Sequence, residues 1–264
     1  MPVHAGRLGF WFRPQDRAQI IKDPPDTIPD VLVFYDPLTN KQGNTNYYFT
    51  ILDYYGGTDV QPVRDVWPVI KAREEALGFR VTLIQSYEQL PNDLSKYVHI
   101  WDIGYASPYV GHPFNPTTKL SNYLKQGGAM FLLGENVAFG NRDDAIEVFV
   151  TAMGGGNITT YDADFAYYTN ITSTVQPEFL LANNSNSITF GAPNVFTNWG
   201  TGTPIATAGT TLPTAVCWKT GSLSNARAGA IVSVLDINFF GGSFAPAYYN
   251  PNFIANLSII MNKK

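Results

Sequence analysis

Residues 129–140 read AMFLLGENVAFG, an apolar run followed by a turn. The run is typical of a strand that is buried on both faces, and a helix is predicted to begin at Arg142-Asp143-Asp144. In an open α/β sheet, a turn at this place can present a reactive Ser or Cys at the carboxyl end of the strand. This turn offers Glu135 and Asn136 instead, and neither is an activated nucleophile.

Similar apolar runs recur along the chain and alternate with helical patterns. The predicted core strands are Val31–Tyr35, Val81–Ile84, Val98–Ile103, Met130–Leu133 and Ile231–Leu235. Helices are predicted from an Asp65 cap with Pro68 in the first turn, over residues 117–126 and 143–153, and from about Asn252 to Met261. This alternation predicts a flavodoxin-like α/β fold, with a mostly parallel sheet and helices on both faces.

Two regions depart from that pattern. Residues 1–30 hold five prolines and no long helical pattern, so we expect an extended N-terminal arm. Residues 31–264 then form a single α/β domain. Within it, residues 156–228 are rich in Asn, Thr and Ser, and we expect a β-rich excursion at the edge of the sheet, with strand-like runs at Ile158–Tyr161 and Ser187–Phe190.

Three segments carry a resemblance to a known family. Residues 94–101 look like the approach to its third strand, residues 120–134 are similar to its helix, double glycine and elbow strand, and residues 229–236 with 252–257 look like its closing strand and helix. Together they resemble the class I glutamine amidotransferase-like domains. The pattern is most similar to non-catalytic branches, such as gliding-motility and intraflagellar-transport type domains. The family's elbow cysteine and its His-x-Glu pair are missing here, so the resemblance implies the fold without glutaminase activity.

Composition limits the possible partners and compartments. The net charge is −4 with no basic cluster, which gives nucleic-acid binding no electrostatic support. No apolar run is long enough to span a membrane, and no signal peptide is recognisable, so we expect synthesis in the cytoplasm and a place in a virion or cell-surface assembly. Cys217 is the only cysteine and is interpreted as a buried structural thiol. We expect no cofactor and assign no metal ligands.

Polar residues follow the predicted strands at the edge where open α/β sheets bind ligands. The ligand-cleft candidates are Asp36, Asp102, Tyr105, Glu135, Asn136, Asp236 and Asn238. Their carboxylates could bind a hard cation, act as a general acid/base pair, or cap helices and satisfy loop amides. His112 is read as a surface loop residue and His99 as a residue of the core or edge.

Aromatic residues suggest contact surfaces. Only 14% of residues are charged and 14% are aromatic, which fits either an ordinary neutral surface or a surface that is buried against other subunits. The interface candidates are Phe10, Trp11, Phe12, Tyr47, Tyr48, Tyr248 and Tyr249. The favoured function is a non-catalytic structural or interaction subunit of a larger assembly, of the virion or surface-filament type, which associates with itself or with other subunits. The alternatives are a carboxylate- or metal-dependent hydrolase and a carbohydrate- or peptide-binding domain.

Overall fold

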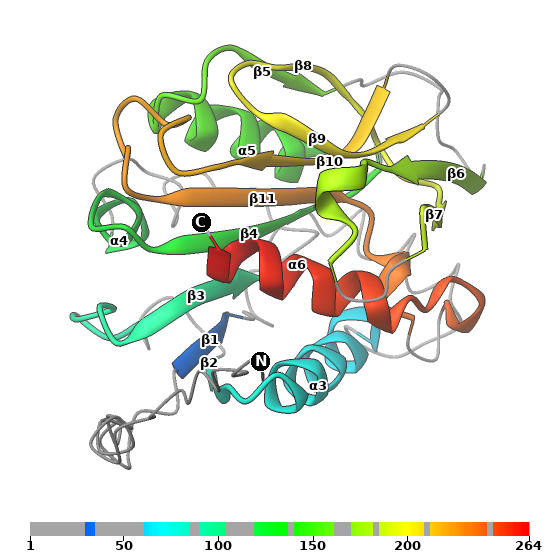
Figure 1. Cartoon of the computed structure of the whole chain (residues 1–264), viewed down its shortest axis with the longest axis horizontal. Helices are drawn as coiled ribbons and strands as arrows, with labels where there is room; N and C mark the ends of the chain where they lie inside the picture. The colour runs from blue at the N-terminus through cyan, green and yellow to red at the C-terminus, as the bar shows by residue number, and fades with distance from the viewer. Residues whose placement is uncertain are drawn as a thin grey trace, which may run out of the picture.

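The computed structural model describes residues 30–34, 61–84, 90–103, 119–136, 140–160, 170–181, 185–208, 212–241 and 245–263. Within these ranges nine strands form one sheet (Figure 1). From edge to edge it contains β2 (Arg80–Ile84), β1 (Asp30–Phe34), β3 (Tyr97–Asp102), β4 (Ala129–Gly134), β11 (Ala230–Leu235), β10 (Leu212–Trp218), β9 (Thr203–Ala208), β6 (Asn170–Val175) and β7 (Ser187–Gly191).

The five predicted core strands form the parallel half of this sheet. Every neighbouring pair from β2 through β1, β3 and β4 to β11 is parallel, in the strand order of flavodoxin-like folds. All residues of β4 and β11 are buried, which explains why these strands are apolar throughout. The flavodoxin-like prediction is therefore confirmed for these strands.

The β-rich excursion extends the same sheet. β10, β9, β6 and β7 follow β11 in antiparallel pairing. A separate ribbon pairs β5 (Ile158–Thr160) with β8 (Phe196–Trp199). Both strand-like runs predicted in this region are strands, so its β-rich character is confirmed.

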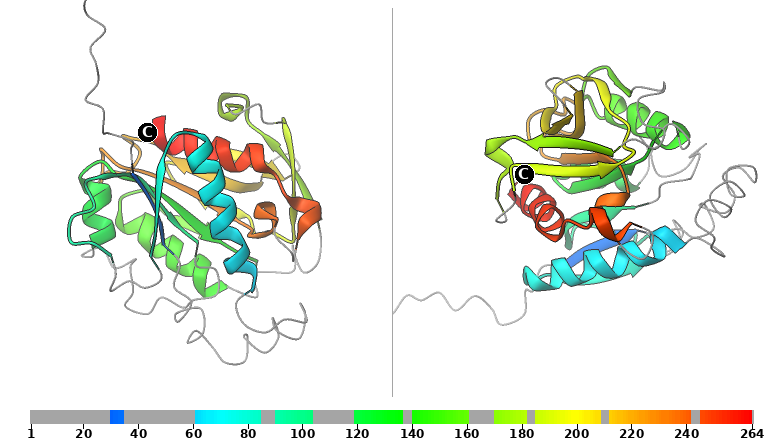
Figure 2. Two further views of the ribbon diagram at one scale, coloured as in Figure 1. Left: turned by 90° about the horizontal axis from the view of Figure 1, so that it is seen from below. Right: turned by 90° about the vertical axis from the view of Figure 1, so that its right-hand side faces the viewer.

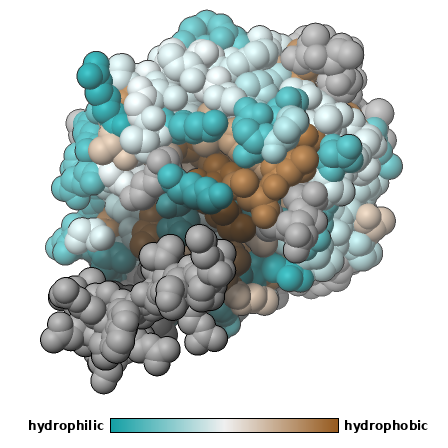
Figure 3. All heavy atoms as spheres, in the orientation of Figure 1, coloured by the Kyte–Doolittle hydropathy of each residue, from teal (hydrophilic) through white to brown (hydrophobic). Residues whose placement is uncertain are grey.

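Helices cover both faces of the sheet, as predicted (Figure 2). On one face α3 (Gln61–Ala76) and α6 (Pro251–Lys263) share an apolar core with side chains such as Trp101, Phe131 and Val232. On the other face α4 (Lys119–Lys125) and α5 (Gly140–Ala152) pack on the alternate side chains, such as Ile100 and Met130. On the face that carries α6, an apolar patch is bordered by polar residues (Figure 3).

The prediction for α3 was wrong in two respects. The helix begins at Gln61, so Asp65 is not its cap and Pro68 lies beyond its first turn. Pro62, the second residue of the helix, explains the start at Gln61. Proline is tolerated in the first turn of a helix, where backbone N–H groups lack helical partners. The buried face consists of Val66, Ile70 and Glu74, whereas Leu77 is exposed beyond the helix end. Residues 94–97 form a hydrogen-bonded turn that leads into β3.

Candidate functional site

The carboxyl ends of β4 and β11 lie side by side. The two strands pair in parallel, with Leu235 opposite Gly134, so that Glu135 and Asp236 leave the sheet as neighbours. Both side chains are buried, at 2% and 0% exposure. The structure therefore brings these two predicted site residues together at the edge where ligands bind in open α/β sheets.

Glu135 uses both carboxylate oxygens within the chain. Oε1 accepts hydrogen bonds from the backbone N–H and the side-chain amide of Asn136, at 3.0 and 3.1 Å. Oε2 accepts the N–H of Ile237, the residue that follows Asp236, at 2.9 Å. The turn where a nucleophile elbow would stand is thus a connection between the ends of β4 and β11.

Asp236 and Asn238 bind the end of β7. Asp236 accepts the Gly191 N–H at 2.9 Å and the Asn238 N–H at 3.0 Å, and the Asn238 side-chain amide donates to the Gly191 carbonyl. Together they satisfy both backbone groups of Gly191, as a paired strand would. A Cβ at residue 191 would lie about 3 Å from Asn238 and Tyr248, so glycine suits this close approach.

Asp143 and Asn194 complete the arrangement. Asp143, in the first turn of α5, accepts the Glu135 N–H at 3.0 Å and the Asn194 side-chain amide at 2.7 Å. The Asn194 N–H donates to the Leu235 carbonyl at 3.0 Å. Sequence reasoning missed Asn194, which lies about fifty residues from its partner Asp143.

These contacts define a crossing segment, residues 191–195, which lies over the ends of β4 and β11. We call Glu135, Asp143, Asn194, Asp236 and Asn238 the strand-end cluster. Every member forms a hydrogen bond with another member: the Glu135 N–H with Asp143, Asp143 with Asn194, and Asp236 with the Asn238 N–H. Glu135 and Asp236 also accept the backbone N–H groups of Ile237 and Gly191. The polar groups of the expected ligand cleft therefore hold the chain's own backbone.

Burial raises the pKa of the acidic members. Loss of solvent raises the pKa of Glu135 to about 7. The hydrogen bonds from Asn136 and Ile237 favour the charged form and lower the pKa, but their effect is smaller. Burial also raises the pKa of Asp143 and of Asp236 well above its usual range, and the charge of Glu135 adds to the effect on Asp236. A carboxyl group with a pKa near 7 suits proton transfer, but Glu135 is shielded from solvent.

The other predicted cleft residues have separate roles. Asp102, at the end of β3, forms a fully buried ion pair with Arg142 at 3.1 Å. Arg142 also donates from Nε to the Leu133 carbonyl at 2.5 Å, and so ties α5 to β4. Asn136 is half-buried and contacts Glu135. Asp36 and Tyr105 lie outside the described residues, as does His112.

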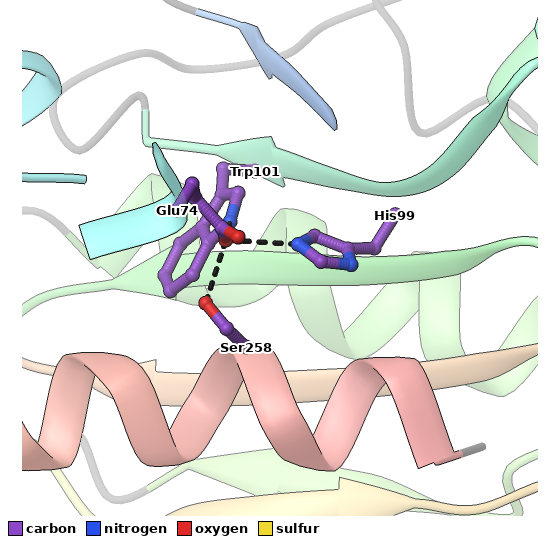
Figure 4. Close-up of polar contacts among 4 residues, drawn as sticks. All are labelled: Glu74, His99, Trp101 and Ser258. Carbon is purple, nitrogen blue, oxygen red and sulfur yellow. Dashed lines mark hydrogen bonds and ion pairs between the residues drawn. The ribbon is translucent and has the colours of Figure 1, made fainter. Parts of the chain in front are cut away.

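A second buried carboxylate was not predicted. Glu74 of α3 accepts hydrogen bonds at one oxygen from His99 Nε2 (2.8 Å), Trp101 Nε1 (2.5 Å) and Ser258 Oγ (2.6 Å), as Figure 4 shows. Glu, His and Ser meet here, but His99 and Ser258 both bind the carboxylate, so the imidazole is not placed as a base for the hydroxyl. The cluster joins α3, β3 and α6. Glu74 lies at helical spacing from Val66 and Ile70, and this spacing in the sequence is the pattern that could have predicted its burial.

Two of the interface candidates are described, and both are anchored within the chain. The Tyr248 hydroxyl donates to Asn170 Oδ1 at 2.6 Å, and the Tyr249 hydroxyl accepts from Arg73 at 2.9 Å. Tyr249 remains 41% exposed. The remaining interface candidates, Phe10, Trp11, Phe12, Tyr47 and Tyr48, lie outside the described residues.

Other reactive chemistry is limited in the described part of the chain. Cys217 is buried, and burial raises the pKa of its thiol to about 12, as expected for a structural cysteine. The described residues include no group of three or more His, Cys, Asp or Glu side chains arranged to hold a metal ion. Within the same ranges, no helix combines the length and apolar character that a bilayer crossing requires.

Comparison with known proteins supports the fold. No protein-family model and no curated protein sequence matches the chain. Among solved structures, the N-terminal domain of mmIFT52 superposes with a TM-score of 0.53 at 12% identity, over 73% of this chain and 90% of that one. A glutamine amidotransferase from Thermotoga maritima gives a TM-score of 0.42 at 9% identity, over 90% of this chain and 93% of that one. The similarity to the mmIFT52 domain is one of fold alone.

Proposed function

We propose that this protein is a non-catalytic subunit of a larger assembly, in which an amidotransferase-like domain serves as a scaffold. The finer proposal is an assembly of the virion or surface-filament type, in which copies of the chain associate with one another or with other subunits. We infer that the protein is a non-catalytic member of the amidotransferase-like fold, because its sequence has no cysteine at the elbow turn.

One observation carries the proposal. The polar residues at the ends of β4 and β11, where this fold class binds ligands, hold the chain's own crossing segment. A substrate that replaced this segment would leave several buried carboxylates and backbone N–H groups without partners. The cluster thus supports a role in holding the fold together rather than in turnover.

Two further observations support a role in assembly. The apolar patch on the face that carries α6 is of a kind that marks protein contacts (Figure 3). The low fraction of charged residues and the abundance of aromatic residues match the composition of interfaces. The similarity to the mmIFT52 N-terminal domain supports the fold on which this proposal rests.

Light scattering coupled to gel filtration tests the proposal. We expect the purified chain to show a defined mass greater than that of a monomer, with the mass rising with concentration. The double variant Glu135→Gln/Asp236→Asn should retain this mass, because neither side chain is proposed to contact a partner. A chain that stays monomeric at every accessible concentration would overturn the proposal, and electron microscopy of the larger species would distinguish a filament from a closed particle.

A further inference from the structure

β7 is one edge of the sheet, at the opposite end from β2 (Figure 1). It pairs antiparallel with β6, with Ser173 opposite Ile188, and the Val175 N–H donates to the Asn186 carbonyl. Because hydrogen-bonded and non-bonded pairs alternate, the backbone groups of Ile188 and Phe190 face β6. Those of Ser187, Thr189 and Gly191 consequently face away from the sheet.

The outward groups differ along the strand. Gly191 is bound by Asp236 and Asn238 on this outer side, as described above. The Ser187 carbonyl accepts the Ser185 hydroxyl. Among the described residues, we find no hydrogen-bond partner for the Ser187 N–H or for the N–H and C=O of Thr189. An open stretch of strand edge therefore remains at residues 187–189, and the strand-end cluster closes it at Gly191.

The side chains of this edge do not block pairing. Natural proteins protect open edges with charged residues, prolines or bulges, but β7 reads SITFG. Ser187 and Thr189 are exposed on one face, and Ile188 is buried on the other. Nothing in the strand prevents a further strand from continuing the sheet.

We propose that β7 pairs antiparallel with β7 of a second copy of this chain, with the two-fold axis at Ile188. This inference rests on the proposed function and names one contact of the assembly. In such a pairing Ser187 of each copy lies opposite Thr189 of the other, so all the outward N–H and C=O groups meet a partner. The Ser187 carbonyl can accept a second hydrogen bond beside the one from Ser185, because it has two lone pairs.

The chemistry of the edge favours a second copy over a different strand. A symmetric contact places each residue near its own counterpart, so an edge with a charged residue would repel itself, whereas this one is uncharged. The facing pairs would be Ser with Thr, which stabilise sheets by hydroxyl hydrogen bonds. The sheet already contains such a pair, because the Thr172 and Thr189 hydroxyls lie 3.1 Å apart.

The open stretch is short, and this sets the strength of the contact. Pairing over residues 187–189 supplies about four backbone hydrogen bonds between the copies. The contact should therefore be weak alone and depend on protein concentration. In a larger assembly, it would act together with other contacts.

Sedimentation velocity over a concentration series tests the pairing, with the variant Thr189→Pro. The Thr189 N–H points away from β6, so proline removes the outward donor while the β6 ladder keeps its bonds. Because two bonds are lost across the axis, we expect dimerisation at least about tenfold weaker. Thr172→Ser is the control on the neighbouring strand β6: it keeps the hydroxyl that lies beside Thr189 and adds no charge, so self-association should be unchanged.

Amide hydrogen exchange of the unmodified chain gives a second readout that does not depend on the variant folding. The exchange of the Thr189 N–H should slow as concentration rises, while that of the Ile188 N–H, which faces β6, should not change. Self-association that persists unchanged in Thr189→Pro, or Thr189 exchange that ignores concentration, would overturn the pairing and leave the proposed assembly function standing. A chain that is monomeric throughout would overturn both.

Discussion

Glu135 and Glu74 are buried carboxylates that serve the same physical purpose. Each accepts three hydrogen bonds, Glu135 from Asn136 and Ile237, and Glu74 from His99, Trp101 and Ser258. Burial of a carboxylate is unfavourable unless donors surround it, and each of the two carboxylates has at least one donor from a distant part of the chain, such as Ile237 for Glu135 and Ser258 for Glu74. Each side chain therefore connects elements that the sequence alone does not bring together.

The strand-end cluster predicts that stability declines as pH rises toward neutrality. The folded-state pKa of Glu135, about 7, lies above its usual value near 4.5, so its contribution to stability is complete below pH 4.5 and is lost as pH rises through 7. Asp143 and Asp236 shift in the same direction. The loss from Glu135 is up to about 3 kcal/mol. Urea unfolding at about pH 5 and about pH 8 measures it.

Glu135→Gln separates this effect from other titrations. The variant cannot ionise, so we expect a smaller loss of stability between the two pH values than in the unmodified chain. It should be less stable at low pH, because one of its two terminal groups becomes a donor facing the Ile237 N–H. An identical pH dependence in both proteins would show that Glu135 is not the titrating group.

Glu74→Ala should lower the free energy of unfolding by about 3 to 5 kcal/mol. The truncation leaves the buried donors of Trp101 and Ser258 without their acceptor. Glu75→Ala is the matched control on the next residue of α3, where an exposed side chain pairs with Lys71, and it should change stability by less than about 0.5 kcal/mol. Equal effects of the two substitutions in urea unfolding would contradict the role given to Glu74.

At the scale of elements, local patterns predicted strands better than helix boundaries. Apolar runs identified all five parallel strands. The reason is clearest for β4 and β11, which are buried along their whole length and need apolar side chains nearly throughout, whereas β2 at the edge is only partly buried. The start of α3 was misplaced because Asp65 is a good cap by type, while Pro62 sets the start one turn earlier. The burial of Glu74 on α3 was not predicted, because a charged residue is buried only where it finds partners, here in β3 and α6.

The crossing segment includes a strained residue that can be tested. Ala192 has φ of 68°, a left-handed conformation that costs an L-residue about 1 to 2 kcal/mol. Ala192→Gly relieves that strain, but glycine also increases the entropy of the unfolded chain, which offsets part of the gain. The free energy of unfolding should therefore rise by up to about 1 kcal/mol.

Ala145→Gly is the control for this substitution. Ala145 lies inside α5, where the same change should lower stability by about 1 kcal/mol. Opposite signs for the two variants in thermal or urea unfolding would support the crossing segment as described. A loss of stability in Ala192→Gly as large as that in Ala145→Gly would count against its geometry.

At the scale of the whole molecule, the sequence predicted which polar residues meet at one edge of the sheet but not what they bind. Glu135, Asp236 and Asn238 were predicted from their places after strands, since parallel strands end at one edge of a sheet. Their partners Gly191 and Asn194 come from the β-rich excursion, and no local pattern predicts which part of an excursion returns to that edge. The distinction between a ligand cleft and a filled site therefore required the structure.

The N-terminal arm remains a prediction, and it can be tested on the whole chain. Since β1 begins at Asp30, deletion of residues 1–29 leaves that strand intact. We expect the truncated chain to unfold with a free energy close to that of the full chain and to form a smaller assembly by light scattering. An unfolded or aggregated product would mean that Phe10, Trp11 and Phe12 complete the chain's own core.

Amide hydrogen exchange of Gly191, Asn194 and Ile237 tests most directly whether the strand-end site is filled by the chain itself. Their N–H groups donate to Asp236, to the Leu235 carbonyl and to Glu135. We predict that all three exchange as slowly as the amides of β4 and β11, through global unfolding. Fast exchange at these three amides, beside slow exchange in both strands, would mean that the site opens to solvent and would contradict the proposed scaffold.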